Sequence, residues 1–315
     1  MDEHILAWLL EEKEPSIRYK TLTELLAYPS GSGEVVSAKK AVATCKNVER
    51  IFARTDERGV FPHKPEYYGN WTTFTYLTAL AELGLTGEDP RIWPIVDWIL
   101  TPGDDKREYF MQKELAPYAY ILDEGNLGAC RQAAFLSTLI RLGYLDDPRV
   151  QRLVEVFVDK CRFDGGYLCC WKKSRHAGQE PKSCYIATVP ALQLYSVLPM
   201  RYRCGPNYDA LISYFTSRDM IYSKAEPGRI IADTRLGLFD GGTSHISTVA
   251  QAMCRLGLGD IPEMRDVWDI LKTKPQVGGK YILEAASTKK AILTDKPGLP
   301  NKWVTFYMCL FEKYI

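Results

Sequence analysis

One pattern recurs along the chain and limits the folds that it can adopt. Segments 71–85, 130–144 and 244–258 each carry an apolar run with helical spacing that ends in a Leu-Gly pair, and 184–198 carries a similar run. Their starts, at Trp71, Cys130, Cys184 and Ser244, lie 59, 54 and 60 residues apart. A helical unit repeated at such a spacing cannot bury its apolar face alone, so neighbouring units must stack.

Each of these helices, called inner below, is followed by a second, outer helix. Outer helices are expected over 91–100, 148–160, 208–219 and 263–272, and 35–54 is expected to form one amphipathic helix. Inner helices are expected to start near residues 16, 71, 130, 184, 244 and 301. Glycine follows three of them, at Gly84, Gly143 and Gly257, where a left-handed residue can end a helix. No strand ladder is evident, so the sequence predicts an all-α fold.

The ends of the chain bear on how these hairpins assemble. Six hairpins could stack as an open solenoid or close into a ring around a central cavity. The last inner helix, within 298–315, has no outer helix after it, and the N-terminal segment could supply one. We therefore expect residues 1–315 to form a single closed domain.

Three segments resemble a known superfamily. The repeats DGGY with SCYIATVPALQLY (164–167 and 183–195), DGGTSHISTVAQAMCRLG (240–257) and the ending GLPNKWVTFYMCLF (298–311) are similar to terpenoid cyclases and protein prenyltransferase β-subunits. The resemblance covers nearly the whole chain. It implies a single α/α toroid (α6–α6 barrel) with its site in the central cavity, and an isoprenoid-type substrate.

Aromatic residues gather at or before the predicted inner-helix starts. An aromatic-lined cavity suits a long apolar isoprenoid, and ring faces can stabilise a carbocation. The alternative is that these rings fill the space between helix layers. The candidate substrate-binding residues are Tyr68, Trp71, Tyr118, Tyr167, Trp171, Tyr185 and Trp303.

Cysteine and histidine residues provide a second candidate group. Cys170, His176 and Cys184 lie close together in the sequence, and His245 follows one repeat later. Zinc requires three or four such ligands in tetrahedral geometry, although this spacing fits no standard finger. The alternative is that reduced cysteines pack at the helix starts.

The resemblance adds a catalytic hypothesis to this group. Prenyltransferase β-subunits carry an Asp-x-Cys-Tyr segment and a later His, and Cys184-Tyr185 and His245 match these positions. Lys182 stands where the aspartate would be, and the candidate replacements are Asp240, Cys170 and His176. The resemblance thus implies Cys184, His245 and Asp240 as catalytic residues and zinc as a possible cofactor.

The acidic motifs of terpene cyclases find no clear counterpart. The chain has no Asp-x-Asp-Asp string, and 104-DDKRE-108, which fits a magnesium-diphosphate motif, is expected to be a loop at a repeat turn. Carboxylates such as Asp164 and Asp233 precede inner helices, and paired carboxylates in an aromatic barrel would suit carbohydrate hydrolysis.

Charge and cysteine content bear on partners and location. Forty basic residues against 39 acidic ones give a net charge of +1, which provides no whole-chain attraction to nucleic acid. The N-terminal apolar run, Ile5 to Leu10, is too short for a signal peptide or membrane span. Nine cysteines without a secretory signal are expected to be reduced, which indicates a cytoplasmic protein.

Three functional hypotheses follow from the sequence. The first is an isoprenoid-processing or isoprenoid-binding protein, terpene cyclase-like or prenyltransferase-like. The second is a carbohydrate-active α/α-barrel enzyme, and the third is a non-catalytic toroid that binds a ligand or partner. Fold alone does not choose between them.

Overall fold

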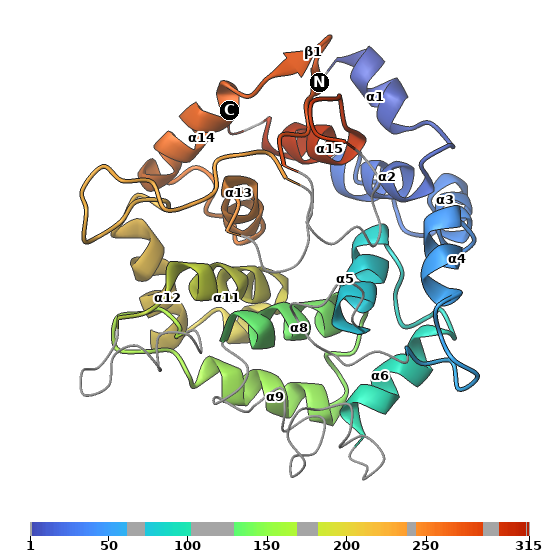
Figure 1. Ribbon diagram of the computed structural model, residues 1–315, viewed down its shortest axis with the longest axis horizontal. Coiled ribbons are helices and arrows are strands. Elements are labelled where there is room, and N and C mark those ends of the chain that lie inside the picture. The colour runs from blue at the N-terminus through green and yellow to red at the C-terminus, as the bar shows by residue number, and fades with distance from the viewer. Residues whose placement is uncertain are drawn as a thin grey trace.

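The computed structural model describes residues 2–61, 73–101, 129–168, 182–237, 244–285, 296–312 and 314. Its regular structure is mostly helical, which confirms the predicted all-α class. Five inner helices lie near the middle of the assembly together with α2 (Figure 1). They are α5 (Thr73–Leu83), α8 (Ala129–Arg141), α11 (Tyr185–Val197), α13 (Ile246–Arg255) and α15 (Lys302–Phe311). Helix α2 (Pro15–Lys20) continues into a π-helical turn, η1 (Thr21–Leu25).

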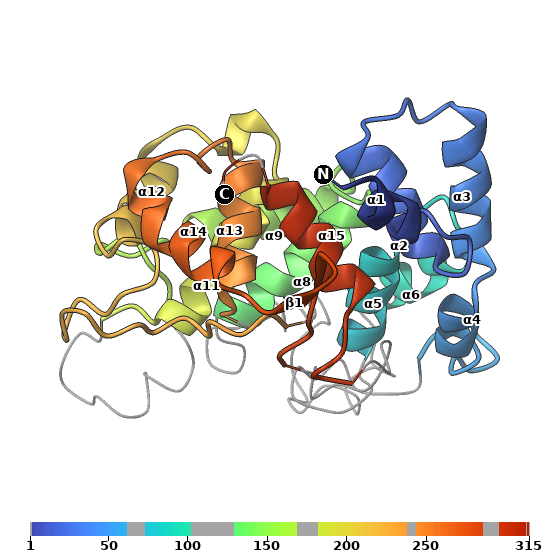
Figure 2. The same ribbon diagram turned by 90° about the horizontal axis from the view of Figure 1, so that it is seen from above.

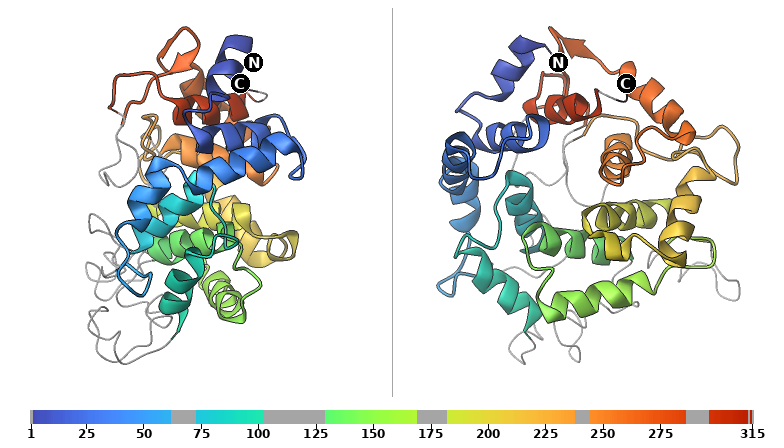
Figure 3. Two further views of the ribbon diagram at one scale, coloured as in Figure 1. Left: turned by 90° about the vertical axis from the view of Figure 1, so that its right-hand side faces the viewer. Right: turned by 180° about the vertical axis from the view of Figure 1, so that it is seen from behind.

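The remaining helices lie around the outside, as the view from behind also shows (Figure 3). The outer helices are α1 (Glu3–Leu9), α3 (Gly33–Ala43), α4 (Lys46–Phe52), α6 (Ile92–Leu100), α9 (Pro148–Val158), α12 (Pro206–Thr216) and α14 (Arg265–Lys272). Short 3-10 turns, η3 (Met200–Tyr202) and η4 (Pro262–Met264), precede α12 and α14. In the described ranges, no helix is both long and apolar enough to cross a membrane.

The inner helices pack in sequence order. Helix α5 packs on α8, α8 on α11, α11 on α13, α13 on α15, and α15 on α2 and η1. An ion pair between Lys20 Nζ and Glu82 Oε1, at 3.9 Å, joins α2 to α5. From above, α12 and α14 lie at one end of the long axis, and α3 and α4 at the other (Figure 2). One apolar cluster extends through both layers.

The two ends of the chain contact each other. Lys302 Nζ at the start of α15 donates to Glu11 Oε2 at 2.8 Å. Lys280 lies over the Trp8 ring, with its Nζ 4.5 Å from the ring centroid. Lys280 belongs to a small hairpin of β1 (Gln276–Val277) and β2 (Lys280–Tyr281), which lies beside α1 (Figure 1). These contacts place α1 against the last inner helix.

Two local expectations were wrong. Residues 35–54 form two helices rather than one, because Cys45 is extended (φ −70°, ψ 153°) and caps α4. Thr44 and Cys45 are both weak helix formers, so little opposes this break. No strand ladder was expected, yet residues 276–281 form a small hairpin; Gly278 and Gly279 form its turn, both with positive φ. The expected glycine helix ends are confirmed, with positive φ at Gly84, Gly143 and Gly257.

The DGG turn after α9 fixes the start of the next inner helix. Asp164 accepts hydrogen bonds from the Ser183 hydroxyl at 2.5 Å and the Ser183 amide at 3.0 Å. The Tyr167 amide donates to Thr188 Oγ1 at 3.0 Å, one turn into α11. Burial opposes ionisation of Asp164, but the hydrogen bonds from Ser183 outweigh it and lower the pKa of this carboxyl. Asp164 therefore holds the repeat turn in place.

The same clamp recurs before the last inner helix. The Tyr281 amide donates to Thr305 Oγ1 at 2.9 Å, and the Asn301 amide donates to the Tyr281 carbonyl at 2.9 Å. In the earlier unit, the Cys184 amide donates to the Tyr167 carbonyl at 2.8 Å in the same way. Thr188 and Thr305 therefore occupy equivalent positions in α11 and α15.

Gly165 provides a test of how tightly this turn is packed. Its φ is +79°, and a Cβ there would lie 2.0 Å from the Ala210 carbonyl oxygen in α12. Gly143 has a similar φ of +94°, with nothing within 4 Å of an added Cβ. We expect Gly143→Ala to lower the free energy of unfolding by about 1 kcal/mol from backbone strain alone. Gly165→Ala should cost roughly 3 kcal/mol or more, because the turn must also move.

Urea denaturation of both variants and the parent measures this difference. Equal costs at the two glycines would contradict the close packing of the turn on α12.

Candidate functional site

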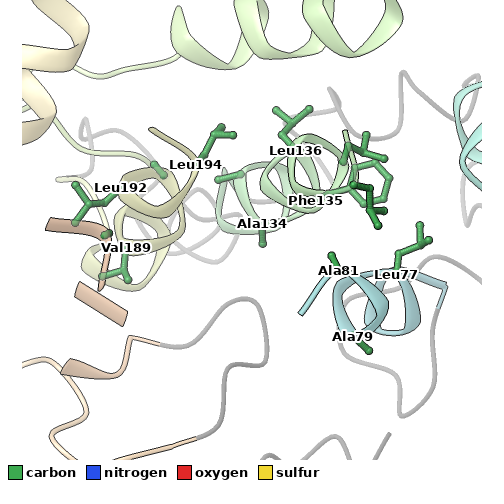
Figure 4. Packing of buried hydrophobic residues seen from close by; sticks show 14 of the residues in the cluster. Leu77, Ala79, Ala81, Ala134, Phe135, Leu136, Val189, Leu192 and Leu194 are labelled. Carbon is green, nitrogen blue, oxygen red and sulfur yellow. The ribbon is translucent and has the colours of Figure 1, made fainter. Parts of the chain in front are cut away.

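The inward face of each inner helix is the face opposite the residues that contact the outer helices. In α8, Gln132 accepts a hydrogen bond from Lys160, just past α9, at 3.4 Å. Leu136, one turn later, points toward α9, and Ala134 points to the opposite side (Figure 4). Residues four and seven apart share a helix face. The inward face of α8 is therefore Cys130, Ala134, Ser137 and Arg141.

The same reasoning assigns the inward face of α11. Thr188 binds the Tyr167 amide, and the Tyr195 ring lies 5.7 Å from that of Tyr208 in α12, so both face outward. The opposite face consists of Ile186, Pro190, Gln193 and Val197. Ile186 is 55% exposed although α11 packs between α8 and α13.

Two more helices can be aligned in this way. Thr305 corresponds to Thr188, which places Trp303 and Tyr307 on the inward face of α15. Tyr76 of α5 faces outward, where its ring lies 4.5 Å from Phe61, so Phe74 and Thr78 face inward. At the N-terminal ends of four inner helices, the inward residues are thus Phe74, Cys130, Ile186 and Trp303.

The predicted aromatic residues divide between the two faces. Tyr167 is fully buried and stacks on Phe157 of α9 at 4.7 Å, and Tyr185 meets Phe215 of α12 edge-on at 5.8 Å. Burial raises the pKa of both phenols. Both rings therefore pack between the layers, and Trp303 is the one on the inward face. Tyr68, Trp71, Tyr118 and Trp171 lie outside the described residues.

Cys184 and His245 both stand at helix starts. Cys184 caps α11 and is half-buried, His245 caps α13 and is 9% exposed, and the two helices pack together. Within the described ranges, no group of three or more His, Cys, Asp or Glu side chains is placed to hold a metal ion. The other proposed ligands, Cys170, His176 and Asp240, lie outside those ranges.

His245 faces a carboxylate in the preceding loop. Its Nδ1 lies 3.4 Å from Asp233 Oδ2. The Asp233 amide donates to the Ser244 carbonyl at 2.9 Å, and the Ile246 amide donates to the Asp233 carbonyl at 2.7 Å. Hydrogen bonds from Arg235 lower the pKa of Asp233, so the carboxylate beside the imidazole is ionised. The sequence pattern indicated Asp233 only as one of several carboxylates that precede inner helices. The structure places it as the charged neighbour of His245.

A second charged group at the opposite end of the inner helices was not predicted. Glu82, near the end of α5, is 6% exposed and accepts hydrogen bonds from Arg141 at 2.5 Å and from the Tyr307 hydroxyl. Lys20 lies 3.9 Å away. Burial would raise the pKa of Glu82, but Arg141 and Lys20 outweigh it and lower the pKa to about 2. Burial together with Glu82 raises the pKa of Tyr307.

The network extends further along the inner layer. Lys20 Nζ donates to Glu24 Oε1 at 3.1 Å, and Arg255 at the end of α13 lies 3.5 Å from Glu24 Oε2. We call these six residues the end network: Lys20, Glu24, Glu82, Arg141, Arg255 and Tyr307. The end network joins α2, η1, α5, α8, α13 and α15.

The end network has a counterpart in the sequence pattern of the repeats. Glu82, Arg141 and Arg255 each stand two residues before the glycine that ends an inner helix, in the strings ELG, RLG and RLG. A charged residue at the same position of three apolar repeats indicates a shared environment. The signs, one negative and two positive, also permit direct pairing.

We expect loss of one partner in the end network to destabilise the fold strongly. Arg141→Met leaves the Glu82 carboxylate buried without its closest charge, at a cost of about 3–5 kcal/mol in free energy of unfolding. Adding Glu82→Leu should recover most of that loss. The control is Arg152→Met, because Arg152 forms an exposed pair with Glu155 at 3.5 Å and should contribute under about 1 kcal/mol. A double variant no more stable than Arg141→Met would contradict direct coupling.

The same carboxylate predicts an acid dependence of stability. The folded pKa of Glu82, about 2, lies below its ordinary value of 4.5, so its contribution is complete above pH 4.5 and is lost as the pH falls toward 2. That contribution is on the order of 3 kcal/mol. Glu82→Gln should remove this part of the pH dependence, measured as the free energy of unfolding between pH 5 and pH 2. An unchanged slope would show that other groups cause the acid loss.

No protein-family model, no curated protein and no solved structure matches the chain. Evidence for a function therefore comes from the geometry of the described residues.

Proposed function

We propose that the chain is an α/α toroid that binds an apolar, isoprenoid-type molecule at the N-terminal ends of its inner helices. The order of inner-helix packing supports the toroid, because α15 returns to α2 and Lys20 of α2 reaches Glu82 of α5. The contacts of Glu11 and Trp8 with Lys302 and Lys280 support closure by joining the first and last units.

The exposure of Ile186 is the observation that carries the proposal. Its side chain is 55% exposed, whereas its neighbours Tyr185 and Ala187 are 7% and 0% exposed. The outward contacts of Thr188 and Tyr195 direct Ile186 away from the outer layer. An exposed branched apolar residue on the inward face of an inner helix favours an apolar ligand there, since covering it is stabilising.

The chemistry of the inward face favours isoprenoid over sugar. Phe74, Cys130, Ile186 and Trp303 are apolar or weakly polar; Ile186 is the exposed one, and the other three are buried at the helix starts. Glycoside hydrolysis requires a carboxylic acid that stays protonated near neutral pH. Glu82, the inward carboxylate of α5, has a pKa of about 2 and is already bound by Arg141 and Tyr307, so it does not meet this requirement.

Two polar residues lie at the N-terminal ends of inner helices, as Ile186 does. His245 and Cys184 cap α13 and α11, which pack against each other. We assign them to the polar end of the ligand, where an imidazole and a thiol can contact a head group or share a metal ion with further ligands. The apolar chain of the ligand would then lie along Ile186.

Ligand titration tests the proposal. Farnesyl- and geranylgeranyl-type compounds should quench the tryptophan emission of the protein at micromolar concentrations. Ile186→Lys should raise the dissociation constant roughly tenfold or more, because the ligand would have to cover an ammonium group. The matched control is Met200→Lys, since Met200 is 72% exposed but lies on the η3 turn outside the inner layer.

Two outcomes would overturn the assignment. Equal affinity in Ile186→Lys and the parent would place the ligand elsewhere. Tight oligosaccharide binding with no response to isoprenoids would favour the carbohydrate-active alternative.

A further inference from the structure

A groove on the outside of the protein lies between α3 and the loop that joins α5 to α6. Its volume is about 480 Å³, which lies within the range of small-molecule sites. One wall consists of α3 residues, and the other of residues between 84 and 90. Helix α3 lies at one end of the long axis (Figure 2). The groove is therefore separate from the inward faces of the inner helices.

The α3 wall combines apolar surface with two ammonium groups. Lys39, Lys40 and Ala43 follow Val36 by three, four and seven residues, so all four lie on one face of the helix. Val36 is 38% exposed. Leu85 provides buried apolar surface from the other wall. Because the stem of a lysine is itself apolar, the two lysines can extend this surface while their ammonium groups stay in water.

Two contacts between the walls set the width of the groove. Arg91, at the start of α6, donates from Nη2 to the Ala43 carbonyl at 2.7 Å and pairs through Nη1 with Glu49 at 2.8 Å. Lys39 Nζ pairs with Glu88 Oε2 at 2.6 Å. The groove is therefore preformed, and a ligand would not have to order its walls.

The two carboxylates that line the groove are already bound. Glu88 pairs with Lys39, and Asp89 accepts from the Arg91 amide at 3.0 Å and from its guanidinium at 2.7 Å. The same Asp-x-Arg turn recurs in other loops, which makes it a structural device of the fold. The other pairs are Asp56 with Arg58, Asp147 with Arg149, and Asp233 with Arg235.

Lys40 differs from the other charged residues of the groove. Within the described part of the chain it makes no ion pair, whereas Lys39, Glu88 and Asp89 each make one. A lysine in the last turn of α3 also favours the helix itself. An anionic group beside Lys40 would gain an ion pair without breaking another, and an attached apolar body would cover Val36.

We propose that this groove is a second binding site, which takes a small amphipathic anion with its apolar body along Val36 and Leu85 and its acidic group at Lys40. Its volume suits a body of one or two rings or a medium-length alkyl chain. A protein partner would need about 800 Å² of surface on this chain, far more than the groove offers. This site does not depend on the isoprenoid site, which lies at the starts of the inner helices.

A matched pair of fluorescent probes tests the proposal. Anilinonaphthalene sulfonate and phenylnaphthylamine share one apolar body, and only the first carries a negative charge. The sulfonate should bind at micromolar concentrations and the neutral probe about fivefold more weakly or worse. Lys40→Glu should raise the dissociation constant of the sulfonate about tenfold, because attraction becomes repulsion, and should leave that of the neutral probe unchanged.

Two control variants separate the groove from general surface effects. Lys46→Glu makes the same charge change at an exposed lysine of α4 outside the groove, and should leave sulfonate binding unchanged. Val36→Ser should weaken both probes severalfold, because it removes apolar contact. Val277→Ser should weaken neither, since Val277 is 59% exposed but lies on β1.

Lysine acetylation read by mass spectrometry locates the bound probe. Saturating sulfonate should slow acetylation of Lys40 and leave that of Lys46 unchanged. The proposal would be overturned by unchanged sulfonate affinity in Lys40→Glu, by an equal loss in Lys46→Glu, or by no protection of Lys40. Isoprenoid binding should be the same in Lys40→Glu and the parent, so each of the two proposed sites can fail while the other stands.

Discussion

The buried carboxylate of Glu82 is the interaction on which the arrangement of the inner layer depends. Apolar packing between helices is non-directional, so it does not by itself fix which helices meet or in what register. Glu82 does so, because it must find cationic and hydroxyl partners once it leaves water. Arg141 and Tyr307 supply them from α8 and α15, and Lys20 adds a third from α2. A slipped or reordered layer would leave that charge unpaired, so the network opposes alternative arrangements of the same apolar helices.

The position of this network also divides the inner layer into two chemically distinct ends. Charges gather where α5, α8 and α13 end, and they are paired with one another. The starts of the inner helices instead carry the exposed Ile186 and the buried Trp303, together with the N-cap residues Cys184 and His245. Side chains whose charges are already paired form a poor binding site, since a ligand would have to break their existing ion pairs. The open apolar surface at Ile186 has no such cost, which is why we place the ligand at that end.

The repeated helices, their glycine ends and the all-α class could be predicted because they depend on local patterns. The candidate site depends on helix rotation, which local patterns leave open. Tyr185 and Ile186 are adjacent, yet one faces Phe215 of the outer layer and the other faces inward. The outward contacts of Thr188 and Tyr195 set that rotation. The aromatic pattern therefore indicated Tyr167 and Tyr185 as substrate-binding residues, although both pack between the layers. It gave no indication of Ile186, which is not aromatic. Partners for Glu82 come from helices far apart in the sequence, so the network could be suspected from the ELG and RLG strings but not assembled.

Repetition within one chain gives a way to separate structural from functional residues. The Asp-x-Arg turn occurs before helices in several units and the threonine clamp in two, so each has a structural reason that does not depend on any ligand. A residue becomes a functional candidate where one copy of such a device makes a contact that the other copies do not explain. Asp233 meets this criterion through its contact with His245, whereas Asp164, although half-buried and strongly hydrogen-bonded, only holds its turn. A perturbed pKa alone would have selected Glu82 as a functional residue. Its pKa is lowered by Arg141 and Lys20, which are its structural partners in the inner layer.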